Sequence, residues 1–171
     1  MIAQEILYAE NQRFKQWWLW LLLLGVHGLF LSGVYQQIIR NIPFGDKPMS
    51  NTGLILTECL LILITLVILN IKLDTQIKND GIYFRFFPFQ FSFIYVSWEL
   101  LDKCFVRKYS PIKEFGGWGL RYSFWGNGKA YNISGNQGLQ LELTNKKKIL
   151  IGTQNPEEIT AVLVKIKQLK S

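Results

Sequence analysis

The stretch WWLWLLLLGVHGLFLSGVYQQII, from Trp17 to Ile39, contains no Asp, Glu, Lys or Arg. As an α-helix it would measure roughly 35 Å, which is enough to cross a hydrocarbon core of about 30 Å. A signal peptide would have a shorter apolar stretch that ends at a small-residue cleavage site. Tryptophans open the stretch shortly after Arg13 and Lys15, as is typical of an aromatic belt at a membrane surface. We therefore predict a transmembrane helix over residues 17–39.

A second apolar run, PMSNTGLILTECLLILITLVILNI, extends from Pro48 to Ile71, with Glu58 as its only charged residue. A charged side chain at the bilayer centre costs about 3 kcal/mol. The Leu, Ile and Val residues of this run each contribute roughly 0.3 to 0.6 kcal/mol, or about 4 to 8 kcal/mol together. Insertion is favoured, so we predict a second transmembrane helix over residues 53–72.

Residues 40–52 between the two runs contain Pro43, Gly45, Asp46 and Pro48, which predict a short extracytoplasmic turn. The two helices then form an antiparallel hairpin, and both termini lie on one side of the membrane. Positive charges favour the cytoplasmic side. The terminal side carries more of them near the helix ends than the turn does: Arg13, Lys15, Lys72, Lys78 and Arg85 against Arg40 and Lys47.

We therefore expect residues 1–16 to be an N-terminal cytoplasmic or interfacial segment and residues 73–171 to be a cytoplasmic domain. Lys and Arg outnumber Asp and Glu in this domain, so it carries most of the net charge of +7. The two cysteines, Cys59 and Cys104, lie far apart in the sequence, and an unpaired Cys104 agrees with a reducing compartment.

His27 and Glu58 are the polar groups of interest within the apolar runs, since such groups often mark proton or ion pathways. Measured from the turn, His27 lies about twelve residues deep and Glu58 about six, a difference of roughly 9 Å. We therefore expect no direct pair. Instead, Gly25, Gly28 and Ser32 would form a small-residue face on which the second helix packs, with Glu58 bonded to Ser32 or water.

After residue 72 the apolar pattern becomes alternating, with repeated turn signals, which predicts a small antiparallel sheet system. In Leu139–Leu143 the leucines would face inward, while Gln140 and Glu142 face out. Asn155 and Pro156 then start a C-terminal helix. Its apolar stripe should pack on the sheet: Ile159, Val162, Leu163, Ile166 and Leu169.

About seven short strands followed by one amphipathic helix match the layout of a pleckstrin-homology-like (PH-like) β-barrel or sandwich capped by the helix, but periodicity alone leaves other α+β folds open. The choice rests on a resemblance carried by the segments GGWGLR (Gly116 to Arg121), AYNISGNQGLQLEL (Ala130 to Leu143) and ILIGTQNPEEI (Ile149 to Ile159). The chain resembles small, uncharacterised bacterial membrane proteins with two transmembrane helices and a C-terminal bacterial PH-like domain. The resemblance extends to PFGDKPMS (Pro43 to Ser50) and KCFVRKYSP (Lys103 to Pro111). It implies a membrane-anchored α+β protein of the bacterial inner membrane and says almost nothing about activity.

Catalysis has little support in the sequence. Glu99 and Asp102 form the nearest approach to a carboxylate pair, and Ser97 would cap one helical turn there, with both acids facing solvent. We find no phosphate-binding glycine loop, paired-cysteine metal site or nucleophile elbow. The sequence therefore predicts a protein without a cofactor, a metal site or catalytic residues.

Two surfaces are candidates for binding. The basic one includes Arg107, Lys108, Arg121 and Lys129, which either face an anionic membrane or serve solubility. The other is aromatic, because Phe87, Phe89 and Phe91 alternate along one strand; they are either core residues or a tip against the bilayer or a partner. Specific phosphoinositide recognition is not expected, since Tyr83 replaces a cation between Lys78 and Arg85. No nucleic-acid motif is present.

From the sequence we expect a non-catalytic scaffold that binds the lipid bilayer and either another protein or a second copy of itself. The alternatives are an accessory subunit of a membrane transport complex that uses Glu58 and His27, and an unrecognised enzyme that uses Glu99 and Asp102.

Overall fold

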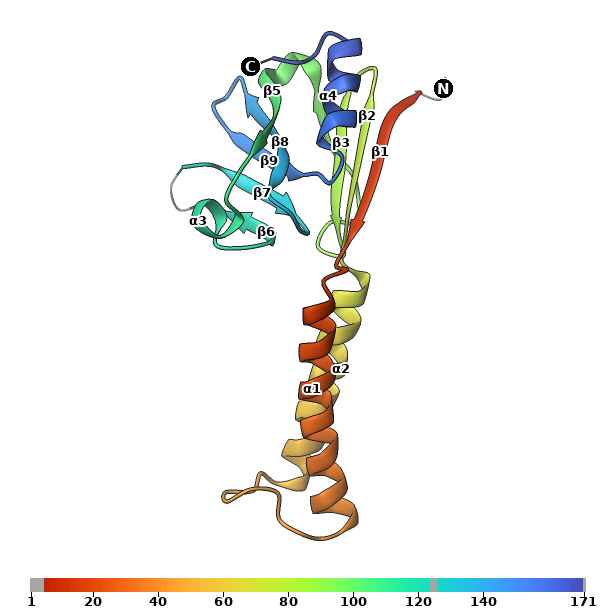
Figure 1. Ribbon diagram of the computed structural model, residues 1–171, viewed down its shortest axis with the longest axis vertical. Helices are drawn as coiled ribbons and strands as arrows, with labels where there is room; N and C mark the ends of the chain where they lie inside the picture. The colour runs from red at the N-terminus through yellow and green to blue at the C-terminus, as the bar shows by residue number, and fades with distance from the viewer. Residues whose placement is uncertain (1–4, 124–125, 171) are drawn as a thin grey trace. The chain divides into compact units, whose positions relative to one another are not determined.

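In the computed structural model, residues 5–123 and 126–170 are described, and they fall into two units. Residues 15–70 form one unit, and residues 1–14 together with 71–171 form the other. The second unit therefore combines the start of the sequence with everything that follows the second helix. Figure 1 shows the elements of both units.

The helical unit contains α1 (Trp17–Val34), the π-helical turn η1 (Tyr35–Ile39) and α2 (Asn51–Asn70). Both predicted helices form, and both are long and apolar enough to span a membrane. In the most apolar 18-residue window of the first helix, only 6% is buried inside the protein. In the corresponding window of the second helix, 11% is buried. Packing within the protein therefore does not explain why these helices are so apolar.

The other unit begins with β1 (Ile6–Arg13), a strand that we did not predict. It pairs antiparallel with β2 (Lys72–Lys78), and Arg13 lies opposite Lys72. The residues of β1 that face inward are Tyr8, Glu10 and Gln12, whose polar character hides the alternating pattern. The helical hairpin is therefore an insertion between two neighbouring strands, and the segment 1–16 contributes an edge strand to the domain.

The first sheet has the order β1-β2-β3-β4, with β3 (Gly81–Phe87) and β4 (Ile94–Ser97). Gly81 begins β3 where the backbone of β4 approaches closely. A Cβ atom at this position would lie 2.3 Å from the carbonyl oxygen of Val96, so a larger residue would force the two strands apart.

The second sheet contains five strands in the order β5-β8-β9-β7-β6. Between the sheets along the chain is the 3₁₀ turn η2 (Trp98–Leu100), and the short helix α3 (Pro111–Phe115) follows β5. The strands are β5 (Leu101–Lys108), β6 (Gly119–Tyr122), β7 (Lys129–Asn132), β8 (Gln137–Leu143) and β9 (Lys148–Gly152).

This architecture corrects part of the prediction of an antiparallel barrel or sandwich with about seven strands. The described residues form nine strands in two sheets, and these do not close into a barrel. One extra strand is β1, which comes from before the helices. The sheets are also not purely antiparallel, because β7 pairs parallel to β9. The α+β class is confirmed.

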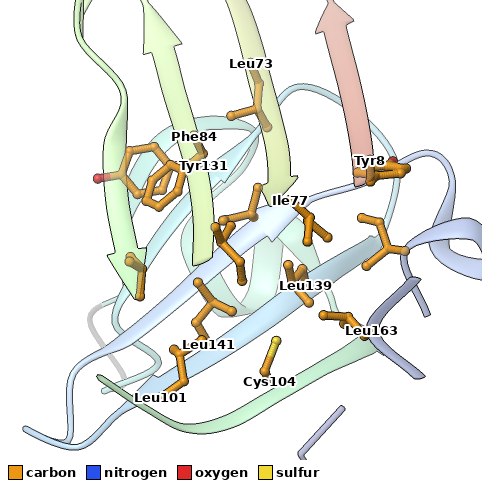
Figure 2. Close-up of a cluster of buried hydrophobic side chains, with 14 of the residues drawn as sticks. Tyr8, Leu73, Ile77, Phe84, Leu101, Cys104, Tyr131, Leu139, Leu141 and Leu163 are labelled. Atoms are coloured by element: carbon orange, nitrogen blue, oxygen red, sulfur yellow. The ribbon is translucent and has the colours of Figure 1, made fainter. Parts of the chain in front are cut away.

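Both sheets and the C-terminal helix α4 (Pro156–Lys165) share one hydrophobic core. Figure 2 shows Leu73 and Ile77 of the first sheet, Leu139 and Cys104 of the second, and Leu163 of α4 in this core. The predicted apolar stripe is confirmed for Ile159 and Leu163, which are buried, and for Val162 and Ile166, which pack against the cluster. Leu169 remains 41% exposed because the helix ends before it.

The opposite face of the second sheet is also covered. Tyr109, Phe115, Ala130 and Leu150 form a smaller buried cluster there. Gln140, which we expected to face solvent, points away from the main core but is buried, because Arg107 lies over it and donates a hydrogen bond to its Oε1 at 3.0 Å. Asn155 starts α4 without a side-chain capping bond; its own N–H donates to Thr153 Oγ1.

Candidate functional site

His27 of α1 and Glu58 of α2 form a direct contact, contrary to our expectation. The His27 Nδ1 atom lies 2.7 Å from Glu58 Oε1, and its Nε2 atom lies 2.9 Å from Thr65 Oγ1. The depth comparison failed because it assumed that both helices meet the turn at the same level. In Figure 1, α1 and η1 continue past the start of α2, which brings the two side chains together.

The packed stripe of α2 explains why this contact is protected. The stripe consists of buried or partly buried residues that follow one another at helical spacing: Leu54, Glu58, Leu61, Thr65 and Ile68. Glu58 is only 6% exposed. Its second oxygen, Oε2, has no hydrogen-bond partner in the described part of the chain, so the pair retains an unused buried acceptor.

The small residues of α1 do not form the packing face that we expected. A Cβ atom at Gly25 or Gly28 would have no neighbour within 4 Å, and both residues are exposed. Ser32 is exposed as well and donates its hydroxyl hydrogen bond to the carbonyl oxygen of Leu29 rather than to Glu58. These residues occupy the helix face opposite to the His27 contact, which is the wrong side for packing against α2.

Phe87, Phe89 and Phe91, which we call the aromatic tip, lie at the connection between β3 and β4. Phe89 is 60% exposed and Phe91 is 74% exposed, whereas Phe87 is half-buried. Core positions in this region belong to Phe84 and Phe86 instead. Phe89 and Phe91 are therefore not core residues, whereas Phe87 is intermediate between core and surface.

Contacts among rings and cations hold the aromatic tip in place. The Phe87 and Phe91 rings meet edge to face with centroids 5.5 Å apart, and Phe89 stacks on Phe86 at 6.0 Å. Lys72 lies over the Phe87 ring at 5.7 Å, and Arg85 lies over Phe93 at 4.6 Å. The cations that flank the tip are therefore Lys72 and Arg85.

The predicted basic residues do not act as one free surface. Arg107 bonds to Glu114 at 2.7 Å, which gives it a structural role beside Gln140. Although burial alone would raise the pKa of Glu114, bonds from Arg107 and the Ser110 N–H lower it. Lys108 and Arg121 are exposed, and Arg121 Nε donates to the carbonyl oxygen of Trp118.

Lys129 lines a cavity of about 590 Å³ in the domain. It lies over the Tyr122 ring at 4.8 Å, and its hydrogen bond with Tyr122 raises the pKa of Lys129. Three more lysines line the same cavity: Lys146, Lys147 and Lys148. The run of lysines was visible in the sequence, but the cavity was not, because it depends on how β4, β7 and β9 converge.

A buried polar network around Glu10 was also missed. The Glu10 carboxylate accepts hydrogen bonds from Tyr8 Oη at 2.7 Å, Thr153 Oγ1 at 2.8 Å and the Gln154 N–H at 2.8 Å. Burial and the nearby Glu10 carboxylate raise the pKa of Tyr8. The network joins β1 to the segment that leads into α4. The only sequence signal is the alternation of Tyr8, Glu10 and Gln12.

The two carboxylates of the enzyme alternative, Glu99 and Asp102, are both exposed, and Ser97 makes no side-chain capping bond. Burial raises the pKa of Cys104 to about 12, so its thiol is not activated as a nucleophile. Among the residues that the structure describes, no group of three or more His, Cys, Asp or Glu side chains could hold a metal ion.

No protein-family model matches this chain, and a search of curated proteins finds no significant match.

Proposed function

We propose that this protein is a non-catalytic domain anchored in the bacterial inner membrane, where it holds a binding surface at the cytoplasmic face. The observation that carries this proposal is the pairing of Arg13 with Lys72. These residues lie just before α1 and just after α2, so both helix ends that lead into the domain arise from one pair of strands. A helical hairpin whose two ends join the domain at the same point is suited to anchor that domain in a membrane.

The apolar surface of the helices supports insertion in a bilayer. Large hydrophobic side chains are exposed along both helices, and their contact with water would cost free energy. Insertion of the helices in lipid removes this cost most directly. The greater number of cations on the domain side of the hairpin supports a cytoplasmic domain.

The aromatic tip supports a function at the membrane surface. Phe87 pairs with Lys72, and Lys72 follows the last residue of α2 by only two positions. The chain therefore keeps Lys72 within about 7 Å of the helix end, since a residue spans at most about 3.6 Å, and Phe87 lies opposite Lys72, about 5 Å further away. We propose that Phe89 and Phe91 enter the interfacial layer while Lys72 and Arg85 face the headgroups.

A spin label tests the position of the aromatic tip. In a Cys59→Ser background, a nitroxide attached at Phe89→Cys in the full chain, reconstituted in vesicles, should be relaxed more by dissolved oxygen than by a water-soluble nickel complex. A label at Lys113→Cys, an exposed residue of α3, is the matched control and should show the opposite preference. If oxygen and the nickel complex relax the labels at the two positions equally, the proposal that the aromatic tip lies in the membrane is wrong.

A transport subunit is the second candidate, and the contact between His27 and Glu58 favours it. A hydrogen-bonded imidazole and carboxylate between apolar helices, with Glu58 Oε2 unpartnered, are components from which proton pathways are built. Purification in mild detergent followed by mass spectrometry identifies the partner. If the protein is a scaffold, Glu58→Leu and His27→Leu should leave the partner bound and the activity of that partner unchanged. If the partner is a transporter and either change stops transport, the second candidate replaces the first.

A further inference from the structure

The cavity lined by Lys129 combines an apolar floor with a cationic rim. Ile94 of β4, Leu143 of β8 and Ile149 of β9 line it, and each also packs against the main hydrophobic core. Tyr131 of β7, which is 3% exposed, contributes to the same lining. The floor is therefore a place where the core between the two sheets reaches the surface. Its volume of about 590 Å³ lies within the usual range for small-molecule sites.

Positive charge surrounds this floor without local compensation from its lining. The described residues that line the cavity include four lysines and no Asp or Glu. Lys148 makes a long ion pair with Glu142 at 3.5 Å, outside the lining, and Lys129 lies on the Tyr122 ring. Lys146 and Lys147 are exposed, and neither is in an ion pair within the described residues. The cavity therefore combines uncompensated positive charge at the rim with an apolar floor.

The backbone holds the lysines at the edge of the cavity. Lys146 has a φ of +64° in the turn between β8 and β9, and its N–H donates to the carbonyl oxygen of Leu143. A Cβ atom at Gly128 would lie 2.0 Å from the carbonyl oxygen of Lys148, so only glycine permits this approach of the two turns. The rim lysines are thus presented by a defined turn rather than by a long loop.

We propose that this cavity binds an anionic phospholipid, with one acyl chain on the floor formed by Ile94, Leu143 and Ile149 and the phosphate at Lys146 and Lys147. This inference rests on the proposed membrane anchoring, because a tethered domain meets bilayer lipid at high local concentration. A soluble anion would use the lysines but not the floor, and a neutral lipid would use the floor but not the lysines. Only an anionic amphiphile matches both parts.

A photoreactive lipid tests this site in the full chain. The protein is placed in phosphatidylcholine nanodiscs with phosphatidylglycerol that carries a diazirine in one acyl chain, and cross-linked peptides are mapped. We expect cross-links at residues 94, 143 or 149 in addition to those on α1 and α2. Labelling of the helices serves as an internal measure of lipid partition.

Two double variants make the test specific. Lys146→Asn with Lys147→Gln should lower labelling of the cavity peptides about fivefold or more, because each cation near the surface contributes substantially to anionic lipid binding. Asparagine keeps the left-handed backbone at position 146 favourable. Lys113→Gln with Lys165→Gln removes the same charge from exposed positions outside the cavity and should leave labelling unchanged. Helix labelling should be equal in all three proteins.

The remaining arms identify the source of binding. A diazirine phosphatidylcholine should label the helices but hardly the cavity, and 10 mM inorganic phosphate, on the order of physiological phosphate, should not compete with phosphatidylglycerol, because it lacks the chain. Equal cavity labelling by the two lipids, competition by phosphate, or no effect of the Lys146 and Lys147 changes would overturn the proposal. Labelled helices with an unlabelled cavity would refute the lipid site alone. Unlabelled helices would refute the membrane anchor itself.

Discussion

Glu10 is the residue that fixes β1 to the rest of the domain. Its carboxylate accepts three hydrogen bonds, two from side-chain hydroxyls and one from the Gln154 backbone, in a place where only 9% of the residue is exposed. The strand is also held by its ladder with β2 and by the bond from Gln12 to the carbonyl oxygen of Gly152, so Glu10 adds the link between β1 and the segment before α4.

Glu10→Gln should therefore destabilise the protein although the side chain keeps its shape. The amide nitrogen would face either the Gln154 N–H, which can only donate, or the Tyr8 and Thr153 hydroxyls, which would have to turn and accept. The charge of the acceptor is lost in both cases, and we expect a loss of about 1 to 3 kcal/mol. Thermal unfolding of the full chain in neutral detergent measures this. The matched control is Glu5→Gln, which changes an exposed carboxylate just before β1. Equal melting of both variants and the parent would show that the network is not formed.

Asp74 gives the domain a pH dependence. Although burial alone would raise its pKa, the hydrogen bonds from Arg85 and Asn11 and the charge of Lys72 lower it. A lowered pKa in the folded state means that the contribution to stability is present above the ordinary value of about 3.9 and is lost as the pH falls through the folded value.

Melting temperatures measured from pH 6 down to pH 3 test this sign. The parent protein should lose stability over the acidic part of the range, and Asp74→Asn should be less stable at pH 6 but lose less on acidification. A variant whose acid sensitivity equals that of the parent would contradict the role of Asp74.

Among the elements, α4 shows how far burial depends on helical position. Leu163 is fully buried in the core between the sheets, whereas the next residue, Val164, is 56% exposed. Leu163→Asp should cost several kcal/mol because it places an unpaired charge in the core, a large part of the stability of a small domain. Val164→Asp should cost less than about 1 kcal/mol. Similar losses for both substitutions, measured by denaturant unfolding, would refute the packing of the helix.

The end of β3 offers a second matched pair. Phe86 is 1% exposed and Phe89 is 60% exposed. Phe86→Ser should destabilise by roughly 3 kcal/mol or more, as a large cavity in a core does, whereas Phe89→Ser should change stability by about 0.5 kcal/mol. Melting curves of the two variants check this. A large loss of stability for Phe89→Ser would show that Phe89 is a core residue.

These elements also show what the sequence can predict. Both long helices and the stripe on α4 were predictable because continuous or periodic apolar residues determine them locally. Strand β1 was not, because Glu10 and Gln12 point inward and are stabilised by Thr153, Gln154 and Gly152, which lie far away in the sequence. The contact of His27 with Glu58 depends on the axial offset of two helices, and no local pattern encodes that offset.

At the scale of the whole molecule, the topology makes the helical hairpin removable. Arg13 and Lys72 are opposite each other in the sheet, so an Asn-Gly turn in place of residues 14–71 can join them as a two-residue hairpin. We expect this shortened chain to be soluble and to unfold cooperatively. A chain that begins at residue 73 lacks β1 and should be markedly less stable. If deletion of β1 had no effect, its place in the sheet would be wrong.

The central claim is that the helices span a membrane and leave the domain on its cytoplasmic side. Single cysteines introduced at Asp46, in the turn between the helices, and at Lys113, in α3, test it in a Cys59→Ser background, because buried Cys104 is shielded from reagent. With a membrane-impermeant maleimide, the cysteine at 46 should react in intact bacterial cells. The cysteine at 113 should react only after the membrane is permeabilised. Reaction at 113 but not at 46 in intact cells would reverse the orientation, and equal reaction at both positions would contradict a membrane-spanning hairpin.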